Sequence, residues 1–274
     1  MFHQREAIVR LLLDDDPATV ELTKRQLLAG GTSNVPDLLD LMSGANAKLA
    51  GTVRELITKI EVSDARDQFA KICQSVTTIE DLEQTCWLLS RVFLPGLNLN
   101  YYMKLLDQWA AEIKYQERTS ETDSDRDSLL PEFFGDQLGF RGNSDDYYNI
   151  RNSLLPCVID SKRGIPTSLA LVYLLVSKRA GLAVTGVDLP GHFVVRYQGR
   201  LFDPFEGGRI LADEDCLRAL PDQRREAIVA MSTEVSPKTI LIHILSNLLY
   251  ILEQEEKDDY REMIAGWLSL VKES

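Results

Sequence analysis

The sequence has few cysteines, and none of them are paired with the spacing of a metal site. Among 274 residues there are four, Cys73, Cys86, Cys157 and Cys216. No two form a CxxC motif, which argues against both a zinc centre and a disulfide framework. Cys73 and Cys86 lie in stretches with helical patterning, so we expect both to be buried apolar residues. We expect no metal and no cofactor.

Long apolar runs are also absent. No stretch approaches the roughly 18 to 20 apolar residues that a membrane-spanning helix needs. The first thirteen residues include Arg5, Glu6 and Arg10, which interrupt the apolar segment that a secretion signal requires. We therefore expect a cytoplasmic protein with no membrane partner.

Basic residues are outnumbered by acidic ones. The chain has 30 Lys and Arg against 42 Asp and Glu, a net charge of −12. Nucleic-acid binding relies on clustered Lys and Arg, so we expect no nucleic-acid partner. Excess negative charge favours solubility, and we expect the partners to be other proteins. The oligomeric state stays open.

Helical patterning runs through residues 1–117. Asp16 is a suitable N-cap, Pro17 suits the first helical position, and the glycines at 30 and 31 end the helix. This start resembles one unit of a HEAT-like helical repeat. Residues 118–128 contain no apolar side chain and predict a polar loop. Further helices are predicted over 35–42, 46–60, 63–75, 79–93 and 98–117.

The centre of the chain has a different pattern. A helix over 166–179 follows a Gly-Ile-Pro corner, and Gly181 ends it. Three short strands follow, and the last two are joined by a tight turn at Gln198 and Gly199. This order predicts a small antiparallel sheet packed on one helix. The strands are predicted over 184–187, 192–197 and 200–202.

Helical patterning returns towards the C-terminus. A short helix is predicted over 211–220, and two longer ones over 236–274 resemble a tetratricopeptide-like pair. The expected fold class is α+β and mostly helical. The expected domains are a helical region over 1–117, the polar loop over 118–128, a core over 129–235 and the helical pair over 236–274.

His192 and Asp203 supply two of the three parts of a Cys-His-Asp thiol catalyst. In such a catalyst, a Cys at a helix N-terminus is stabilised as thiolate by the helix dipole and by an imidazole. A carboxylate then orients the imidazole. His192 and Asp203 are eleven residues apart with a hairpin between them, so both can face one side of the sheet. The helix begins with Pro166, so the thiol is missing.

Five short motifs carry a resemblance to a known family. They read Gly-Phe-Arg-Gly-Asn, Asn-Ser-Leu-Leu, Arg-Gly-Ile-Pro, Pro-Gly-His-Phe and Asp-Pro-Phe, at 139–143, 152–155, 163–166, 190–193 and 203–205. With them, residues 129–211 resemble the transglutaminase-like superfamily, most closely its bacterial SirB-type branch. The resemblance implies a papain-like core with a catalytic His at His192 and a catalytic Asp at Asp203. It places the nucleophile at Pro166, where this chain departs from the family.

Two functions follow from this departure. In the first, the chain is a non-catalytic interaction or regulatory module, and the His192–Asp203 pair is structural or grips a ligand. In the second, it is a hydrolase or acyl transferase acting on amide bonds, with Cys157, Thr167 or Ser168 as an unusual nucleophile.

Other polar residues near the centre have open roles. Arg163 and Asn152 are candidate ligand-binding residues, and Arg163 could instead pair with a nearby Asp. One His and one Asp are too few ligands to predict a metal. His3 and His243 lie in helical stretches and are expected to be ordinary surface or core residues.

Overall fold

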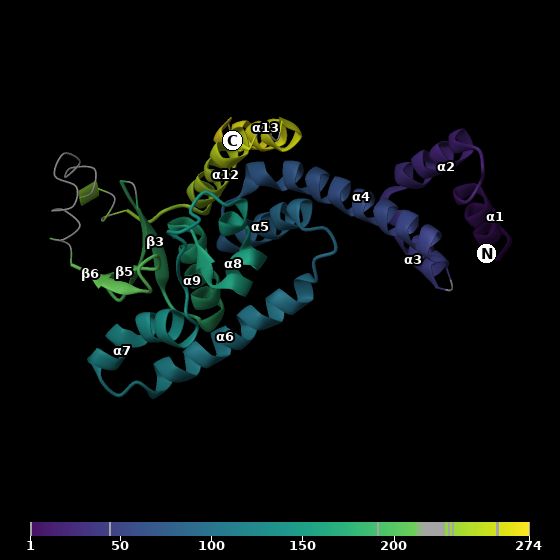
Figure 1. The fold of residues 1–274 in the computed structure, drawn as a ribbon. Coiled ribbons are helices and arrows are strands. Elements are labelled where there is room, and N and C mark those ends of the chain that lie inside the picture. The colour runs from purple at the N-terminus through teal and green to yellow at the C-terminus, as the bar shows by residue number, and fades with distance from the viewer. Residues whose placement is uncertain are drawn as a thin grey trace. The chain divides into compact units, whose positions relative to one another are not determined.

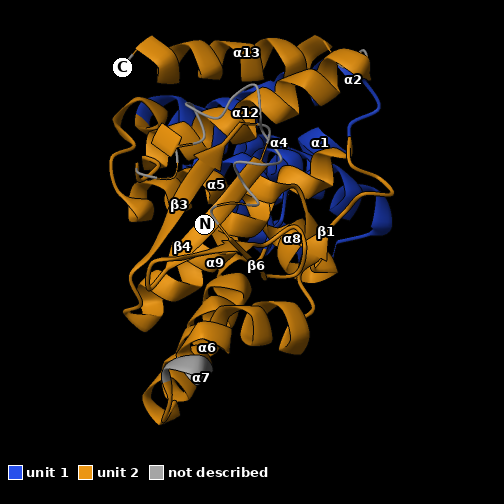
Figure 2. Ribbon diagram, turned by 90° about the vertical axis from the view of Figure 1, so that its left-hand side faces the viewer, with its two compact units in different colours: residues 1–71, 88–97 blue, residues 72–87, 98–274 orange. Residues whose placement is uncertain are grey.

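The computed structural model describes residues 2–43, 45–190, 192–212, 214, 228–229, 231, 233–255 and 258–273. The chain forms two compact units (Figure 2). The first comprises Met1–Lys71 and Leu88–Leu97, and the second Ile72–Trp87 and Asn98–Ser274. Within the described residues, every helix is too short or too polar to cross a membrane.

The first unit is helical, as the sequence predicts. Its helices are α1 (Phe2–Leu12), α2 (Pro17–Ala29), α3 (Val35–Met42) and α4 (Ala47–Ile72), with a 3₁₀ turn η1 at Gly31–Asn34. The Asp16 side chain accepts hydrogen bonds from the amides of Ala18 and Thr19 at the start of α2, which confirms the predicted cap.

One predicted break is wrong. We expected separate helices over 46–60 and 63–75, but α4 is continuous. Glu61 and Val62 include neither Gly nor Pro, so no backbone preference ends the helix there. Buried Val53, Leu56 and Ile60 anchor its apolar side. The resemblance to a HEAT-like repeat stays a prediction.

The second unit holds the remaining helices, together with part of α5. The helical elements of this unit are η2 (Cys73–Ser75), α5 (Ile79–Phe93), α6 (Leu99–Thr119), α7 (Asp123–Leu130), the π-helix η3 (Pro131–Gln137), η4 (Ile150–Ser153), α8 (Leu155–Ser161), α9 (Pro166–Ala180), α12 (Pro237–Gln254) and α13 (Asp258–Glu273). Helix α5 has the bounds predicted from the sequence.

The polar segment over 118–128 is mostly helical rather than a loop. Helix α6 continues to Thr119 and α7 begins at Asp123, so only residues 120–122 separate them. The carboxylate of Asp127 pairs with Arg200 at 2.6 Å, and Leu129 and Leu130 are buried. These contacts stabilise a helix that the composition of the segment alone does not suggest.

The predicted antiparallel sheet is present. It comprises β3 (Val184–Leu189), β4 (His192–Tyr197), β5 (Arg200–Asp203) and β6 (Arg209–Leu211), in the order β3-β4-β5-β6 with every pair antiparallel. The β4–β5 turn has positive φ at Gln198 and Gly199, as expected for a tight hairpin. Strand β6 was not predicted.

Helix α9 is the central element. Nearly all its residues from Thr167 to Ala180 are buried, and it packs on β3 and β4 as well as on α6, α8 and α12 (Figure 1). Gly181 ends it in the left-handed conformation. The α+β class, with one central helix on a small sheet, is confirmed.

A second small sheet lies before α9. Strands β1 (Arg141–Gly142) and β2 (Arg163–Gly164) pair in parallel. The predicted helix over 211–220, with Cys216, lies almost entirely outside the described residues. Cys73 and Cys86 are buried, as expected.

Candidate functional site

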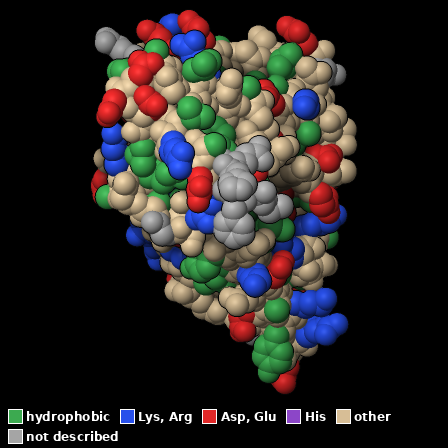
Figure 3. Space-filling view, turned by 90° about the vertical axis from the view of Figure 1, so that its right-hand side faces the viewer, with side chains coloured by type: hydrophobic (Ala, Val, Ile, Leu, Met, Phe, Trp, Pro, Cys, Tyr) green, Lys and Arg blue, Asp and Glu red, His purple; other side chains and the backbone are tan. Residues whose placement is uncertain are grey.

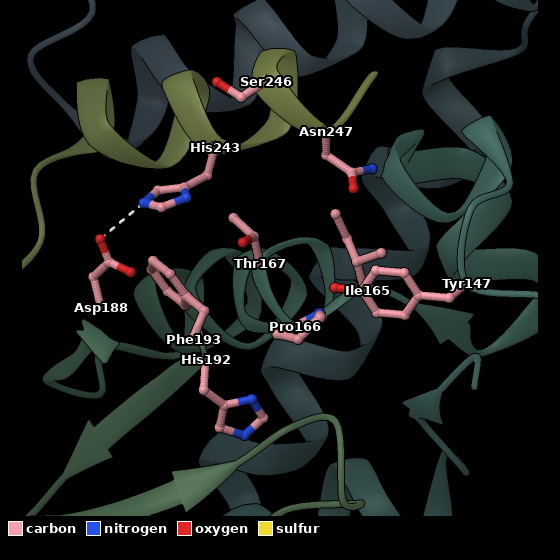
Figure 4. A pocket seen from close by; sticks show the side chains of 10 residues that line it. All are labelled: Tyr147, Ile165, Pro166, Thr167, Asp188, His192, Phe193, His243, Ser246 and Asn247. Atoms are coloured by element: carbon pink, nitrogen blue, oxygen red, sulfur yellow. Dashed lines mark hydrogen bonds and ion pairs between the residues drawn. The ribbon is translucent and has the colours of Figure 1, made fainter. Parts of the chain in front are cut away.

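A hollow of about 330 Å³ lies at the start of α9 (Figure 4). It is bordered by the first residues of that helix, by one side of α12, by the β3–β4 end of the sheet and by a tyrosine. The lining side chains are Tyr147, Ile165, Pro166, Thr167, Asp188, His192, Phe193, His243, Ser246 and Asn247.

His192 and Asp203 form the predicted pair. The Nε2 atom of His192 lies 2.7 Å from Oδ2 of Asp203. The other oxygen of Asp203 accepts hydrogen bonds from the amides of Phe205 and Glu206, and the residue is only 2% exposed. An ionised carboxylate can only accept, so Nε2 carries the proton and Nδ1 stays available. The hydrogen bond to Asp203 raises the pKa of His192, against the opposing effect of burial.

A second His–Asp pair lines the same hollow. The Nε2 atom of His243, on α12, lies 2.8 Å from Oδ2 of Asp188, on β3. This hydrogen bond raises the pKa of His243, again against burial. His243 was expected to be an ordinary surface or core residue, and its pairing with Asp188 was not predicted. The two partners are 55 residues apart, and no local pattern links them.

The two pairs lie on opposite faces of the sheet. Successive strand residues alternate between faces, so His192 and Phe193 point in opposite directions. Asp188 is paired with Phe193 across β3 and β4 and shares its face, and the Phe193 ring makes an edge contact with His243. In Figure 4, the His192 ring accordingly points away from His243. The hollow thus wraps around the end of the strand pair.

Hydrogen bonds and close contacts join the first motif to the second, third and fifth. The first contributes Asn143, whose amide donates to the Gly164 carbonyl and whose side chain donates to Asn152 Oδ1. Gly142 donates to the Phe205 carbonyl at 2.7 Å. A side chain at Gly142 would collide with the Phe205 ring, so this glycine permits the close approach. These four motifs therefore build a frame beside the start of α9.

The three proposed nucleophiles have different surroundings. Cys157 is 4% exposed, within α8, and burial raises the pKa of its thiol. The Ser168 hydroxyl donates to the Asn152 carbonyl at 2.6 Å and accepts from the Ile165 amide, so it acts as a backbone cap. Of the three, Thr167 alone is among the residues that line the hollow.

The two proposed ligand-binding residues bond to the protein itself. The Asn152 side chain donates to the carbonyls of Asp146 and Tyr147 and accepts from Asn143. Arg163 donates to the carbonyls of Gly139 and Lys162. Neither lines the hollow, and their roles in ligand binding stay predictions.

Comparison with known proteins identifies the family. Residues 100–246, more than half of the chain, match the family described as the transglutaminase-like superfamily. The chain belongs to the transglutaminase-like superfamily. The match extends beyond both ends of the predicted core over 129–235, and it includes the α12 residue His243. The narrower SirB-type assignment stays a prediction.

Relatives of this superfamily member occur in bacteria and in mammals. UPF0162 proteins from two strains of Xylella fastidiosa are 32% identical over 190 residues and 33% over 199, covering 64% and 68% of this chain and 67% and 71% of the relatives. Mouse F-box only protein 21 is 30% identical over 147 residues, which are 49% of this chain and 23% of that protein. No solved structure matches the chain significantly.

The hollow offers acid–base groups. Within the described part of the chain, no three His, Cys, Asp or Glu side chains are grouped to hold a metal ion. The site provides two imidazoles, each oriented by a carboxylate, and one hydroxyl at the start of a helix. Such groups can bind a polar ligand or move a proton.

Proposed function

We propose that the chain is a transglutaminase-like protein that lacks the nucleophile and acts as a non-catalytic interaction or regulatory module. The observation that carries the proposal is that Pro166 occupies the first position of α9, at the hollow. Proline has no group that could attack an acyl carbon. The resemblance places the family's nucleophile at this position.

The surroundings of the other candidates support the proposal. The thiolate is the reactive form of a cysteine, and burial disfavours it at Cys157. All three hydrogen bonds of the Ser168 hydroxyl are made to the backbone, at the Ile165 amide and at the carbonyls of Asn152 and Ile165. In Figure 4 the side chains of Thr167 and His192 extend away from each other, so His192 is poorly placed to activate that hydroxyl.

The occurrence of the same region in larger proteins also supports a module. The matching segment makes up 23% of mouse F-box only protein 21, so it stands beside other segments there. We propose that this chain likewise contacts other proteins, within the cytoplasm.

An assay for covalent chemistry tests the proposal. The full chain is incubated with a dye-labelled primary amine and a glutamine-containing protein, and in parallel with a fluorescent iodoacetamide. We expect no amine incorporation and no labelling of Cys157 above that of the denatured-and-refolded control. Incorporation that His192→Ala abolishes would contradict the proposal and establish an acyl transferase.

A hydrolase or acyl transferase using Thr167 is the second candidate. Its support is that the Thr167 hydroxyl lines the same hollow as the Asp188–His243 pair, an arrangement related to a Ser-His-Asp triad. A fluorophosphonate probe distinguishes the candidates. Labelling at Thr167 that His243→Gln removes would favour this enzyme, whereas no labelling favours the non-catalytic module.

A further inference from the structure

The Thr167 hydroxyl has no hydrogen-bond partner among the residues that the structure describes. The residue is 7% exposed and lines the hollow, and its side chain makes no hydrogen bond to any residue that the structure describes. The hydroxyl oxygen is not one of the sealed polar atoms of the core, so it opens on the hollow. It is therefore available to form a hydrogen bond with a ligand that enters there.

The backbone beside Thr167 favours a negatively charged ligand. The first helical hydrogen bond of α9 runs from the Leu169 amide to the Ile165 carbonyl, so the amides of Thr167 and Ser168 precede it. Pro166 has no N–H. Unpaired amides at a helix start carry a partial positive charge and commonly bind anionic groups.

His243 faces this helix start from α12. Its Nε2 is engaged by Asp188, and in Figure 4 its second ring nitrogen lies on the side of the hollow. The titratable groups around it are Asp188 from β3, His192 from β4 and Tyr147, while Phe193 adds an apolar contact. When protonated, His243 donates from Nδ1 into the hollow.

A hydrogen-bond acceptor and aromatic rings also border the hollow. The Asn247 amide nitrogen donates to Ser153 Oγ at 2.7 Å, which leaves Asn247 Oδ1 as an acceptor. Beyond Tyr147, the rings of Tyr148 and Tyr250 lie 5.3 Å apart and are 60% and 47% exposed. A ligand that fits these groups carries an anion, a neighbouring N–H and an aromatic or apolar side chain.

We propose that the end of the hollow bordered by Thr167, His243 and Asn247 binds the carboxylate of an N-acylated amino acid or of a peptide C-terminus. This inference rests on the proposed non-catalytic function. One carboxylate oxygen accepts from the Thr167 hydroxyl and the α9 amides, and the other accepts from His243 Nδ1. The ligand N–H donates to Asn247 Oδ1. This position lies across the sheet from the His192–Asp203 pair.

Proton linkage gives the site a pH dependence. The hydrogen bond to Asp188 raises the pKa of His243, so the protonated, donating form persists further towards neutral pH. A carboxylate ligand binds the protonated form better. The affinity for the carboxylate is therefore highest below the pKa of His243 and falls as the pH rises through that pKa.

The test compares two ligands that differ only in the terminal group, a carboxylate in one and a neutral amide in the other. The full chain is titrated with N-acetyl-L-phenylalanine and with its primary amide by calorimetry, at pH 6 and pH 8.5. We expect the carboxylate to bind at least about tenfold more tightly than the amide at pH 6, since hydrogen bonds to charged groups exceed neutral ones. We expect this preference to shrink at pH 8.5.

Variants of Thr167 and His243 test which residue provides the affinity and which provides the pH dependence. Thr167→Val removes the hydroxyl at nearly constant volume and should weaken carboxylate binding about tenfold, whereas Thr167→Ser should retain it. His243→Gln should abolish the pH dependence. Thr52→Val, a matched control within α4 and away from the hollow, should keep both affinity and pH dependence.

Three results would overturn the proposal. They are equal binding of acid and amide, no binding of either, and unchanged affinity in Thr167→Val. The ligand comparison uses the wild-type chain, so it decides even where a variant fails to fold. A tetrapeptide ending in phenylalanine separates a chain terminus from a free acid, and either result supports carboxylate binding. Turnover of the amide would instead contradict the non-catalytic function.

Discussion

Asp203 connects the candidate site to the folded backbone. One carboxylate oxygen holds the His192 ring, and the other accepts from the amides of Phe205 and Glu206 in the turn that follows β5. Because Asp203 itself is 2% exposed, these protein groups rather than water satisfy its carboxylate. Asp203 therefore has a structural role whether or not the site is catalytic.

Substitutions of Asp203 and of His192 should differ in their effect on the free energy of unfolding. We predict that Asp203→Ala lowers the free energy of unfolding by about 3 kcal/mol, because it removes a buried carboxylate together with its hydrogen bonds to His192 and to the amides of the turn. His192→Ala should cost about 1 kcal/mol, since the His192 side chain is 32% exposed. Urea unfolding of both variants provides the measurement. Equal losses would indicate that the turn does not depend on Asp203.

Sequence reasoning found some residues of the site and missed others for a physical reason. The His192–Asp203 contact was predictable because a tight hairpin brings the two strands together. The Asp188–His243 pair was not, because it depends on how α12 packs against β3. The capping role of Ser168 agrees with its position, since hydroxyls in a first helical turn commonly serve the backbone.

At the scale of elements, close backbone contacts hold the frame of the site. The π-helix η3 approaches the turn between β5 and β6 at Gly135. A side-chain carbon there would lie 2.0 Å from the Gly207 carbonyl oxygen, and neither backbone can yield cheaply. This contact fixes the segment after Asp203 against the helical part of the unit.

We predict that Gly135→Ala destabilises the chain by about 3 kcal/mol or more, since overpacking against backbone forces the two segments apart. Gly266→Ala is the matched control. Gly266 lies within α13 with open space where its side chain would be, so this change should stabilise the chain by about 0.5–1 kcal/mol. Thermal unfolding measures both. An unchanged unfolding temperature in Gly135→Ala would contradict the close packing of these two segments.

Element boundaries show where sequence patterns are insufficient. Helices α3, α5 and α9 follow caps, glycines and apolar periodicity closely. The continuity of α4 and the helical form of residues 123–130 could not be predicted from these signals, because polar composition alone does not prevent a helix. Strand β6 is short, and its partner β5 rather than its own sequence defines it.

At the scale of the whole molecule, charge and family membership limit the possible partners. On the face drawn in Figure 3, acidic and basic side chains are interspersed, and the net charge is −12. This balance is unsuited to a phosphate backbone. Membership of the transglutaminase-like superfamily directs attention to the hollow at the start of α9 instead.

The most direct test of the central claim restores a thiol to the start of α9 in the full chain. We predict that Pro166→Cys reacts with iodoacetamide at pH 7 about tenfold faster than the matched variant Pro237→Cys, which places a thiol at the start of α12. A helix start and a neighbouring imidazole together lower the pKa of a thiol, and adding His192→Gln should slow the reaction. Mass spectrometry of the modified peptide gives the rate. Equal rates for the two thiols, unaffected by His192→Gln, would contradict the claim that Pro166 occupies the position of a lost nucleophile.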